Sequence, residues 1–183
     1  MTDENYLRKV TLGTPEAGNI VLCPYDETWP LQYSEQADKI RKALGDKVRL
    51  LEHVGSTSVP GLCAKPILDI LLLVDDTARE AEYVEPLEQA GYQLRVREED
   101  WFGHRMFKGQ NPVINLHVFS LGCSEADRML LFRDYLRTHP EDRDLYAETK
   151  ERLSQTKWRF VQEYADRKTQ VVHEIMDRAG ICY

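Results

Sequence analysis

Residues 53–70 read HVGSTSVPGLCAKPILDI, and this stretch joins a glycine- and hydroxyl-rich segment to a strand-like apolar run. The run continues to residue 74 as ILDILLLV, and Asp69 is the single charged residue within it. Side chains in a strand alternate between two faces, so Asp69 shares a face with Leu71 and Leu73. Both faces are largely apolar, which predicts a central strand that is covered on both sides.

Asp69 needs a partner, because an uncompensated buried carboxylate costs several kcal/mol of folding free energy. One interpretation is structural, with Lys65 or backbone N–H groups of the preceding loop satisfying the carboxylate. The other is functional, with Asp69 holding a cation or a reacting hydroxyl group. The residues of the apolar run alone leave both interpretations open.

The loop before this strand has the residues of a phosphate-binding turn. A glycine beside a serine after a strand, here Gly55 and Ser56, lets the backbone approach a phosphate group closely. Thr57 adds a hydroxyl group and Lys65 a positive charge. These four residues are candidate phosphate ligands. The same residues also suit a tight connection between two strands with capping hydroxyl groups.

A second apolar strand, INLHVF at residues 114–119, contains His117 on the same face as Asn115 and Phe119. A lone histidine in a strand is often a core residue with one hydrogen bond. His117 gains importance for a site only if the strands that contain Asp69 and His117 are neighbours.

Several arginines are further candidates for binding an anion. Arg133 and Arg137 in LFRDYLRTHP are four residues apart, so they lie on one helical face, and Lys150 follows on the next predicted helix. A guanidinium group can grip a phosphate through two hydrogen bonds. Arg105, in WFGHRMFK, is a further candidate. The alternative for the helical arginines is pairing on a solvated surface with Asp134, Glu141 or Asp142.

Hydrophobic periodicity predicts mixed elements along the rest of the chain. We expect strands at residues 20–23, 48–54, 67–74, 92–97, 104–108 and 113–119. We expect helices at residues 29–44, 77–90, 125–138, 141–153 and 157–179. Thr77 is the predicted cap of the second helix and Pro86 interrupts it. The buried face of the last helix is predicted to be Trp158, Val161, Ala165, Val172, Ile175 and Ala179.

This order predicts an α+β fold, with a mixed sheet, flanking helices and a helical C-terminus. Residues 1–19 form a polar N-terminal segment, and residues 20–183 are expected to form a single domain.

Composition narrows the classes of partner. Lys and Arg number 24 against 31 Asp and Glu, and the net charge of −7 argues against binding to duplex nucleic acid. The longest apolar run, residues 67–74, is too short for a membrane helix, which needs about 20 residues. The four cysteines, Cys23, Cys63, Cys123 and Cys182, form no CxxC pair, and no export signal precedes them. We therefore expect reduced thiols and a cytoplasmic protein.

Three long motifs resemble the GrpB family. They are EHVGSTSVPGLCAKPILDILLLV at 52–74, NLHVF at 115–119 and LFRDYLRTHPEDRDLYAETKERL at 131–153. The similarity extends from about Val21 to Ala179, nearly the whole chain. It implies a nucleotidyltransferase-like fold, with a small mixed sheet and flanking helices.

In that superfamily a Gly-Ser pair precedes a strand with two metal-binding carboxylates, and a third carboxylate lies on a neighbouring strand. Gly55 and Ser56 match the pair, and Asp69 matches the first carboxylate. Leu71 stands at the second position and has no group that binds a metal, while His117 stands at the third. Glu52 and His53 are close in sequence but point to opposite faces of a strand, so at most one of them can complete the set.

The resemblance therefore implies a divergent nucleotidyltransferase that binds a nucleotide or another phosphorylated small molecule and acts on a nucleoside triphosphate and an acceptor. Asp69 and His117 would be its catalytic residues and would bind Mg²⁺ or Mn²⁺. Members of the family also resemble a domain fused behind dephospho-CoA kinase, where the domain is thought to assist folding. Together with Leu71, this supports an alternative in which the chain is a ligand-binding or folding-support module without catalysis.

Overall fold

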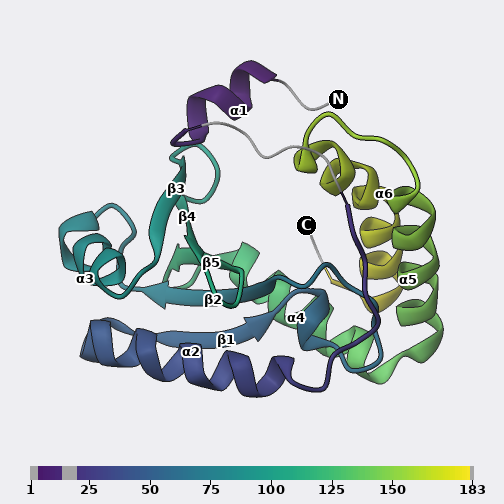
Figure 1. Ribbon diagram of the computed structural model, residues 1–183, viewed down its shortest axis with the longest axis horizontal. Coiled ribbons are helices and arrows are strands. Elements are labelled where there is room, and N and C mark those ends of the chain that lie inside the picture. The colour runs from purple at the N-terminus through teal and green to yellow at the C-terminus, as the bar shows by residue number, and fades with distance from the viewer. Residues whose placement is uncertain (1–3, 14–19, 182–183) are drawn as a thin grey trace.

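Five strands of the chain form one mixed sheet, and helices lie on both of its faces (Figure 1). A computed structural model describes residues 4–13 and 20–181. The strands are β1 (Leu50–Val54), β2 (Leu68–Val74), β3 (Gln93–Glu98), β4 (His104–Gly109) and β5 (Ile114–Ser120). The helices are α1 (Glu4–Val10), α2 (Trp29–Leu44), α3 (Val84–Gln89), α4 (Ser124–Thr138), α5 (Pro140–Ser154) and α6 (Val161–Ala179). The predicted α+β class is confirmed.

The strand order is β1-β2-β5-β4-β3, and only β2 and β5 run parallel. This pairing makes neighbours of the two strands that contain Asp69 and His117. Asp69 lies opposite Asn115 in the register, and Leu71 lies opposite His117. Asp69 and His117 therefore lie on neighbouring strands, as a site that includes both residues requires.

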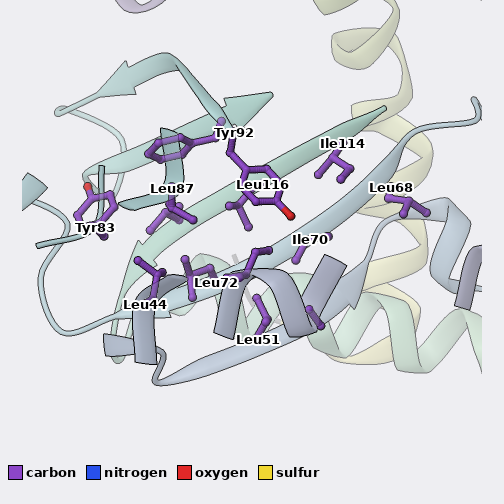
Figure 2. Packing of buried hydrophobic residues seen from close by; sticks show 14 of the residues in the cluster. Leu44, Leu51, Leu68, Ile70, Leu72, Tyr83, Leu87, Tyr92, Ile114 and Leu116 are labelled. Carbon is purple, nitrogen blue, oxygen red and sulfur yellow. The ribbon is translucent and has the colours of Figure 1, made fainter. Parts of the chain in front are cut away.

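One face of the sheet is the main apolar core. Leu68, Ile70 and Leu72 of β2 point to this face and pack with Leu116 of β5 and Leu44 of α2 (Figure 2). These side chains are at most 6 % exposed. Close packing of this kind supplies most of the hydrophobic stabilisation of a domain.

The other face is apolar at one end only. Leu71 and Phe119 are fully buried against Ala126 of α4. Beside them, α4, α5 and α6 form a bundle whose core includes Leu136, Ile175 and the loop residue Leu62. Figure 1 shows α5 and α6 standing at the end of the sheet opposite α3. The rest of this face stays polar, and the candidate site lies there.

In the N-terminal half of the chain, two predicted elements differ from the observed structure. Residues 20–23 form no strand, because Cys23 alone bridges to Ala64 and Val21 is 63 % exposed. Residues 77–90 hold two short pieces, a 3₁₀ turn η3 (Glu80–Glu82) and α3, instead of one helix. Thr77 caps neither piece, because Arg79 and Tyr83 occupy the N-cap positions and the Thr77 hydroxyl group lies 3.2 Å from Ser120 Oγ.

The ends of the chain also differ from the prediction. α6 begins at Val161, so Trp158 precedes it, and its buried residues are Tyr164, Val171, Ile175 and Met176. Ile175 alone is shared with the predicted face. In the N-terminal segment, where no element was assigned, α1 buries Leu7 and Val10. Residues 14–19 lie outside the described part, and no described helix is long and apolar enough to cross a membrane.

Candidate functional site

A pocket of about 630 Å³ lies on the polar part of the second face. Its floor comes from β2 and β5, with Asp69, Asn115 and His117. Its walls come from the loop between β1 and β2, from β3 and β4, and from α1, α5 and α6. The structure therefore brings together six of the predicted residues: Gly55, Ser56, Thr57, Lys65, Asp69 and His117.

The loop is pressed against the floor at Gly55. Gly55 has φ +68°, a conformation that favours glycine. A Cβ atom at this position would lie 2.4 Å from Asp69 Oδ2, a severe clash. Only glycine lets the chain pass this close to the carboxylate. The next residues, Ser56–Ser58, form the 3₁₀ turn η2, so Ser56 stands beside Asp69 at the pocket wall.

Asp69 is satisfied mainly by its neighbours on β5. Asn115 Nδ2 donates to Asp69 Oδ1 at 2.8 Å, and His117 Nε2 lies 3.5 Å from the same oxygen. Burial raises the pKa of Asp69, but the hydrogen bond and charge of His117, the Asn115 amide and the charge of Lys65 outweigh it. The pKa is therefore below its ordinary value, and Asp69 is ionised at neutral pH.

Lys150 of α5 is buried in the pocket wall at 2 % exposure. Its Nζ donates to Ser56 Oγ at 3.0 Å and also to the carbonyl oxygen of Cys63. Within the described part of the chain, no carboxylate forms an ion pair with it. Burial is the main cause that lowers the pKa of Lys150 to about 7.

Other cations surround this point. Lys65 and Lys168 lie over the ring of Tyr164, with Nζ 5.9 and 4.8 Å from its centroid. Lys108 and Arg95 also line the pocket. Among the described residues that line the pocket, five cationic side chains, with Lys150 included, face two carboxylates, Asp69 and Glu98. The pocket is thus basic, although the whole chain has a net charge of −7.

The predicted arginines lie elsewhere. Arg133 binds Glu52, Asp134 and the carbonyl oxygen of His53. Arg137 donates to the carbonyl oxygen of Ser58 and thereby holds the outer side of the loop. Neither arginine lines the pocket. Arg133 therefore stabilises β1 through Glu52 and His53, and Arg137 stabilises the loop through Ser58.

Arg105 points to the opposite face of the sheet. It is 2 % exposed and donates to Glu80 at 2.6 Å, to Glu99 at 2.5 Å and to the carbonyl oxygen of Gly103. The structure does not bring Arg105 to the pocket, because β4 alternates and presents its neighbours His104 and Met106 there instead.

Thr57 and the two residues proposed as substitute ligands have other contacts. Thr57 borders the pocket, but its hydroxyl group meets His53 Nε2 at 2.9 Å on the core side. His53 stacks on Tyr33, and burial lowers the pKa of His53 to about 4. Glu52 shares the face of Asp69 but is held by Arg133. Thus neither Glu52 nor His53 joins Asp69.

The donor set does not form a metal site by itself. Asp69 and His117 supply two donors, and Mg²⁺ or Mn²⁺ prefers several oxygen ligands. Leu71 is fully buried among apolar side chains. Among residues 4–13 and 20–181, no group of three or more His, Cys, Asp or Glu side chains could hold a metal ion. These residues do not fit a divalent cation unless a ligand completes its coordination.

Two histidines and a glutamate extend the floor beyond His117. His104 Nε2 lies 3.1 Å from His117 Nδ1, and His104 Nδ1 lies 2.7 Å from Glu98 Oε2. Glu98 Oε1 accepts from Tyr6 of α1 at 2.7 Å. Glu98 was not a sequence candidate. The β3–β4 pairing that places it opposite His104 is the signal that could have found it.

Comparison with solved structures defines the class of this fold. A Cid1 poly(U) polymerase with Mg and 3′-dATP bound matches 81 % of this chain and 45 % of its own, with a TM-score of 0.51 and 11 % identity. At that identity the match shows the fold alone. The chain therefore has a nucleotidyltransferase-like fold.

The chain belongs to the GrpB family. The family model described as GrpB protein matches residues 19–178. The crystal structure of the conserved protein GrpB from Enterococcus faecalis matches with a TM-score of 0.72 and 26 % identity, covering 86 % of this chain and 98 % of that one. A UPF0157 protein of Halalkalibacterium halodurans is 57 % identical over 181 residues, 98 % of this chain and 92 % of the relative.

A longer relative contains a similar region. A dephospho-CoA kinase of Mycolicibacterium paratuberculosis is 29 % identical over 160 residues. The match covers 73 % of this chain and 39 % of the kinase. The chain thus spans well under half the length of that relative.

Proposed function

We propose that the pocket binds the phosphate group of a nucleotide or of another phosphorylated small molecule, with Ser56 and Lys150 as its first contacts. The observation that carries this proposal is the burial of Lys150 with no carboxylate partner in the described part of the chain. An unpaired buried ammonium group costs several kcal/mol. An anion beside Ser56 Oγ supplies the missing negative charge.

Two further observations support a ligand at this place. Asn115 Oδ1 and Tyr164 Oη are buried polar atoms that have no hydrogen-bond partner among the described residues, and both residues line the pocket. Buried polar groups are nearly always satisfied, so such atoms favour a ligand that satisfies them. The lysines around Tyr164 would hold further phosphate groups, and the pocket volume suits a small molecule.

The test is a calorimetric titration of the whole chain with inorganic phosphate, ATP, GTP, CTP and UTP, with and without Mg²⁺ or Mn²⁺. We expect binding of at least one nucleotide, and about a 100-fold loss of affinity in Lys150→Met, since a charge-assisted hydrogen bond contributes about 1.5–3 kcal/mol. Lys42→Met, on the exposed side of α2, is the matched control and should bind as the wild type does. No binding by the wild type, or equal affinity in Lys150→Met, rejects the proposal.

The metal arms of the titration address Mg²⁺ and Mn²⁺ separately. A cation here would need phosphate oxygens of the ligand to complete its coordination, because Asp69 and His117 are the only donors that the described residues supply. Metal that strengthens nucleotide binding but does not bind alone supports that arrangement.

A second candidate is a ligand-binding or folding-support module without catalysis. Leu71 favours it, because this residue is part of the apolar cluster with Val54, Phe119 and Ala126. The similar region in a dephospho-CoA kinase agrees with a role beside another enzyme. A nucleotide that binds without being turned over supports this candidate.

We also propose a cytoplasmic location. Cys23, Cys63 and Cys123 form no disulfide in the structure, in agreement with reduced thiols, and Cys182 lies outside the described residues.

A further inference from the structure

Helix α1 forms one wall of the pocket and connects two other parts of its wall. Tyr6, Leu7 and Val10 of this helix line the pocket. Residues 160–162, around the start of α6, line it from another part of the chain. Figure 1 shows α1 next to β3, which also lines the pocket. The contacts of α1 with β3 and with the start of α6 therefore determine how this wall is held.

The attachment of α1 to β3 consists of hydrogen bonds along the edge of the sheet. Leu12 N, just after the helix, donates to the carbonyl oxygen of Arg95 at 2.6 Å. Thr11 forms an isolated β-bridge to the same strand. Tyr6 Oη donates to Glu98 at 2.7 Å. Backbone and side-chain groups thus hold α1 to β3 together.

The attachment of α1 to the start of α6 is an exposed ion pair. Arg159 Nη1, two residues before α6, lies 2.9 Å from Glu4 Oε2 in the first turn of α1. The arginine side chain is 67 % exposed and the glutamate side chain 32 %. Among the described residues, this is the only ion pair between α1 and the part of the chain after residue 154. Exposed pairs contribute little to stability, so this attachment is easily broken.

The apolar contacts of α1 are separate from the apolar cores of the domain. Leu7 and Val10 are 9 % and 7 % exposed, so the helix buries some apolar surface. Neither residue belongs to any of the three apolar clusters of described residues. Segments with few contacts to a core open at a lower free energy than the core itself. The helix can therefore separate from the start of α6 while the sheet and the helical bundle stay folded.

We propose that α1 is a lid of the pocket, closed in the free protein by the Glu4–Arg159 ion pair and opened when this pair breaks. The hydrogen bonds to β3 keep the helix attached when the lid is open. This inference rests on the proposed binding of a phosphate group beside Ser56 and Lys150. It adds that the movement of α1 sets the rates at which a phosphorylated ligand enters and leaves the pocket.

Two variants break the ion pair from opposite sides and distinguish a lid from simple attraction. If the pair closes a lid, Glu4→Gln and Arg159→Met both raise the association and the dissociation rate constants, and the dissociation constant hardly changes. If only the charge near the pocket matters, Glu4→Gln speeds the association of an anion and Arg159→Met slows it. The two explanations thus predict opposite signs for the association rate of Arg159→Met.

The rates are measured by stopped-flow fluorescence of the whole chain mixed with ATP, GTP, CTP or UTP, because Trp101 lines the pocket. We expect each single variant to raise both rate constants about twofold to fivefold, the range that corresponds to loss of an exposed ion pair. The double variant should show no further increase, since the same pair is lost in all three proteins. Slower association in Arg159→Met, or unchanged rates in both single variants, overturns the proposal.

The matched control for the rates is Lys47→Met. This substitution also removes a cation from an exposed pair, Lys47–Glu82, but neither residue of that pair lines the pocket. It should leave both rate constants at the wild-type values. Rates that rise equally in Lys47→Met and Arg159→Met would contradict a role that is specific to α1.

Amide hydrogen exchange tests the lid without any ligand. Arg159→Met should speed the exchange of the amides at residues 8–12 about twofold to fivefold, although the substituted residue is outside α1. The amides of β2 and β5 should exchange as in the wild type. Unchanged exchange at residues 8–12 overturns the proposal whether or not a nucleotide binds. Faster exchange there, combined with no binding in the calorimetric titration, supports the opening of α1 and rejects the proposed function instead.

Discussion

The buried arginines and the buried lysine of this chain differ in what surrounds them. Arg105 and Arg133 are each held by two carboxylates of the protein and by a backbone carbonyl group. Lys150 is as deeply buried as Arg105, yet it donates to a hydroxyl group and to a carbonyl oxygen. Of these three cations, only Lys150 has no carboxylate partner among the residues that the structure describes.

This difference is the basis for proposing that Lys150 binds a ligand and that the two arginines stabilise the fold. A cation whose countercharge comes from the protein is a fixed part of the fold, and its removal leaves carboxylates unpaired. A buried cation without one keeps its capacity for an incoming anion. The positions of Arg133 and Arg137 on one helical face predicted anion binding. Their partners in the structure are carboxylates and carbonyl oxygens of the protein itself.

We expect the largest effect on stability from removal of a buried arginine that is paired with carboxylates. Arg133→Met should lower the free energy of unfolding by about 2–4 kcal/mol, a little less than for a fully buried pair, because Glu52 and Asp134 are themselves partly exposed. Urea denaturation measures this change, and phosphate affinity of the folded variant should stay at the wild-type value. Arg41→Met, on an exposed pair of α2, should change stability by less than about 0.5 kcal/mol.

One outcome for Arg133→Met would contradict the distinction between arginines that stabilise the fold and a lysine that binds a ligand. A large loss of phosphate affinity at unchanged stability would make Arg133 a ligand-binding residue, as first predicted from its helical position.

A slightly smaller effect should come from the loop that both sets of cations hold. Gly55→Ala places a Cβ atom against Asp69 at a positive φ, and should cost about 2–3 kcal/mol of stability and shift Ser56 from Lys150. Gly122→Ala is a matched control, since Gly122 also has positive φ (+81°) but has open space around its added Cβ atom. It should cost only about 1 kcal/mol, as measured by thermal unfolding. Equal costs for the two variants would contradict the close approach at Asp69.

The smallest effect is a pH dependence specific to Lys150. The pKa of Lys150 in the free protein is about 7, and a bound anion favours its protonated form. Binding above pH 7 therefore takes up a proton, and affinity falls by up to about tenfold per pH unit as pH rises from 7.5 to 9. Calorimetry with a nucleoside 5′-monophosphate measures it, because that phosphate is already doubly ionised there.

The control for this pH dependence is Lys150→Met, whose weaker binding should show no such decline. The same decline in both proteins would assign the effect to another group and leave Lys150 without the proposed role.

The sequence predicted those parts of the fold that depend on local patterns. The apolar runs at residues 67–74 and 113–119 correspond closely to β2 and β5, since buried central strands have continuous apolar sequences. The prediction of a strand for IVLC at residues 20–23 was wrong, because only Cys23 in this run pairs with another segment, at Ala64. Pattern alone does not reveal whether a partner strand exists.

The site was predicted less completely, for a related reason. Asp69 and His117 stand out as polar residues in apolar strands, and Gly55 and Ser56 as loop residues before one of them. Lys150 has no such local signal beyond its place one helix after the arginines, because its contact with Ser56 spans 94 residues. The partners of a side chain decide its role, and such distant partners have no local sequence signal.

The long span of these contacts also has a consequence for folding. Asp69 and Asn115 are 46 residues apart along the chain, and they meet only when the parallel β2–β5 pairing has formed. Non-local pairings of this kind are generally costly to close before their contacts form. Ser56 and Lys150 meet only when the C-terminal helices have docked. A ligand of this pocket therefore recognises the native protein alone and, at 100 times its dissociation constant, stabilises the entire chain by about 2.7 kcal/mol.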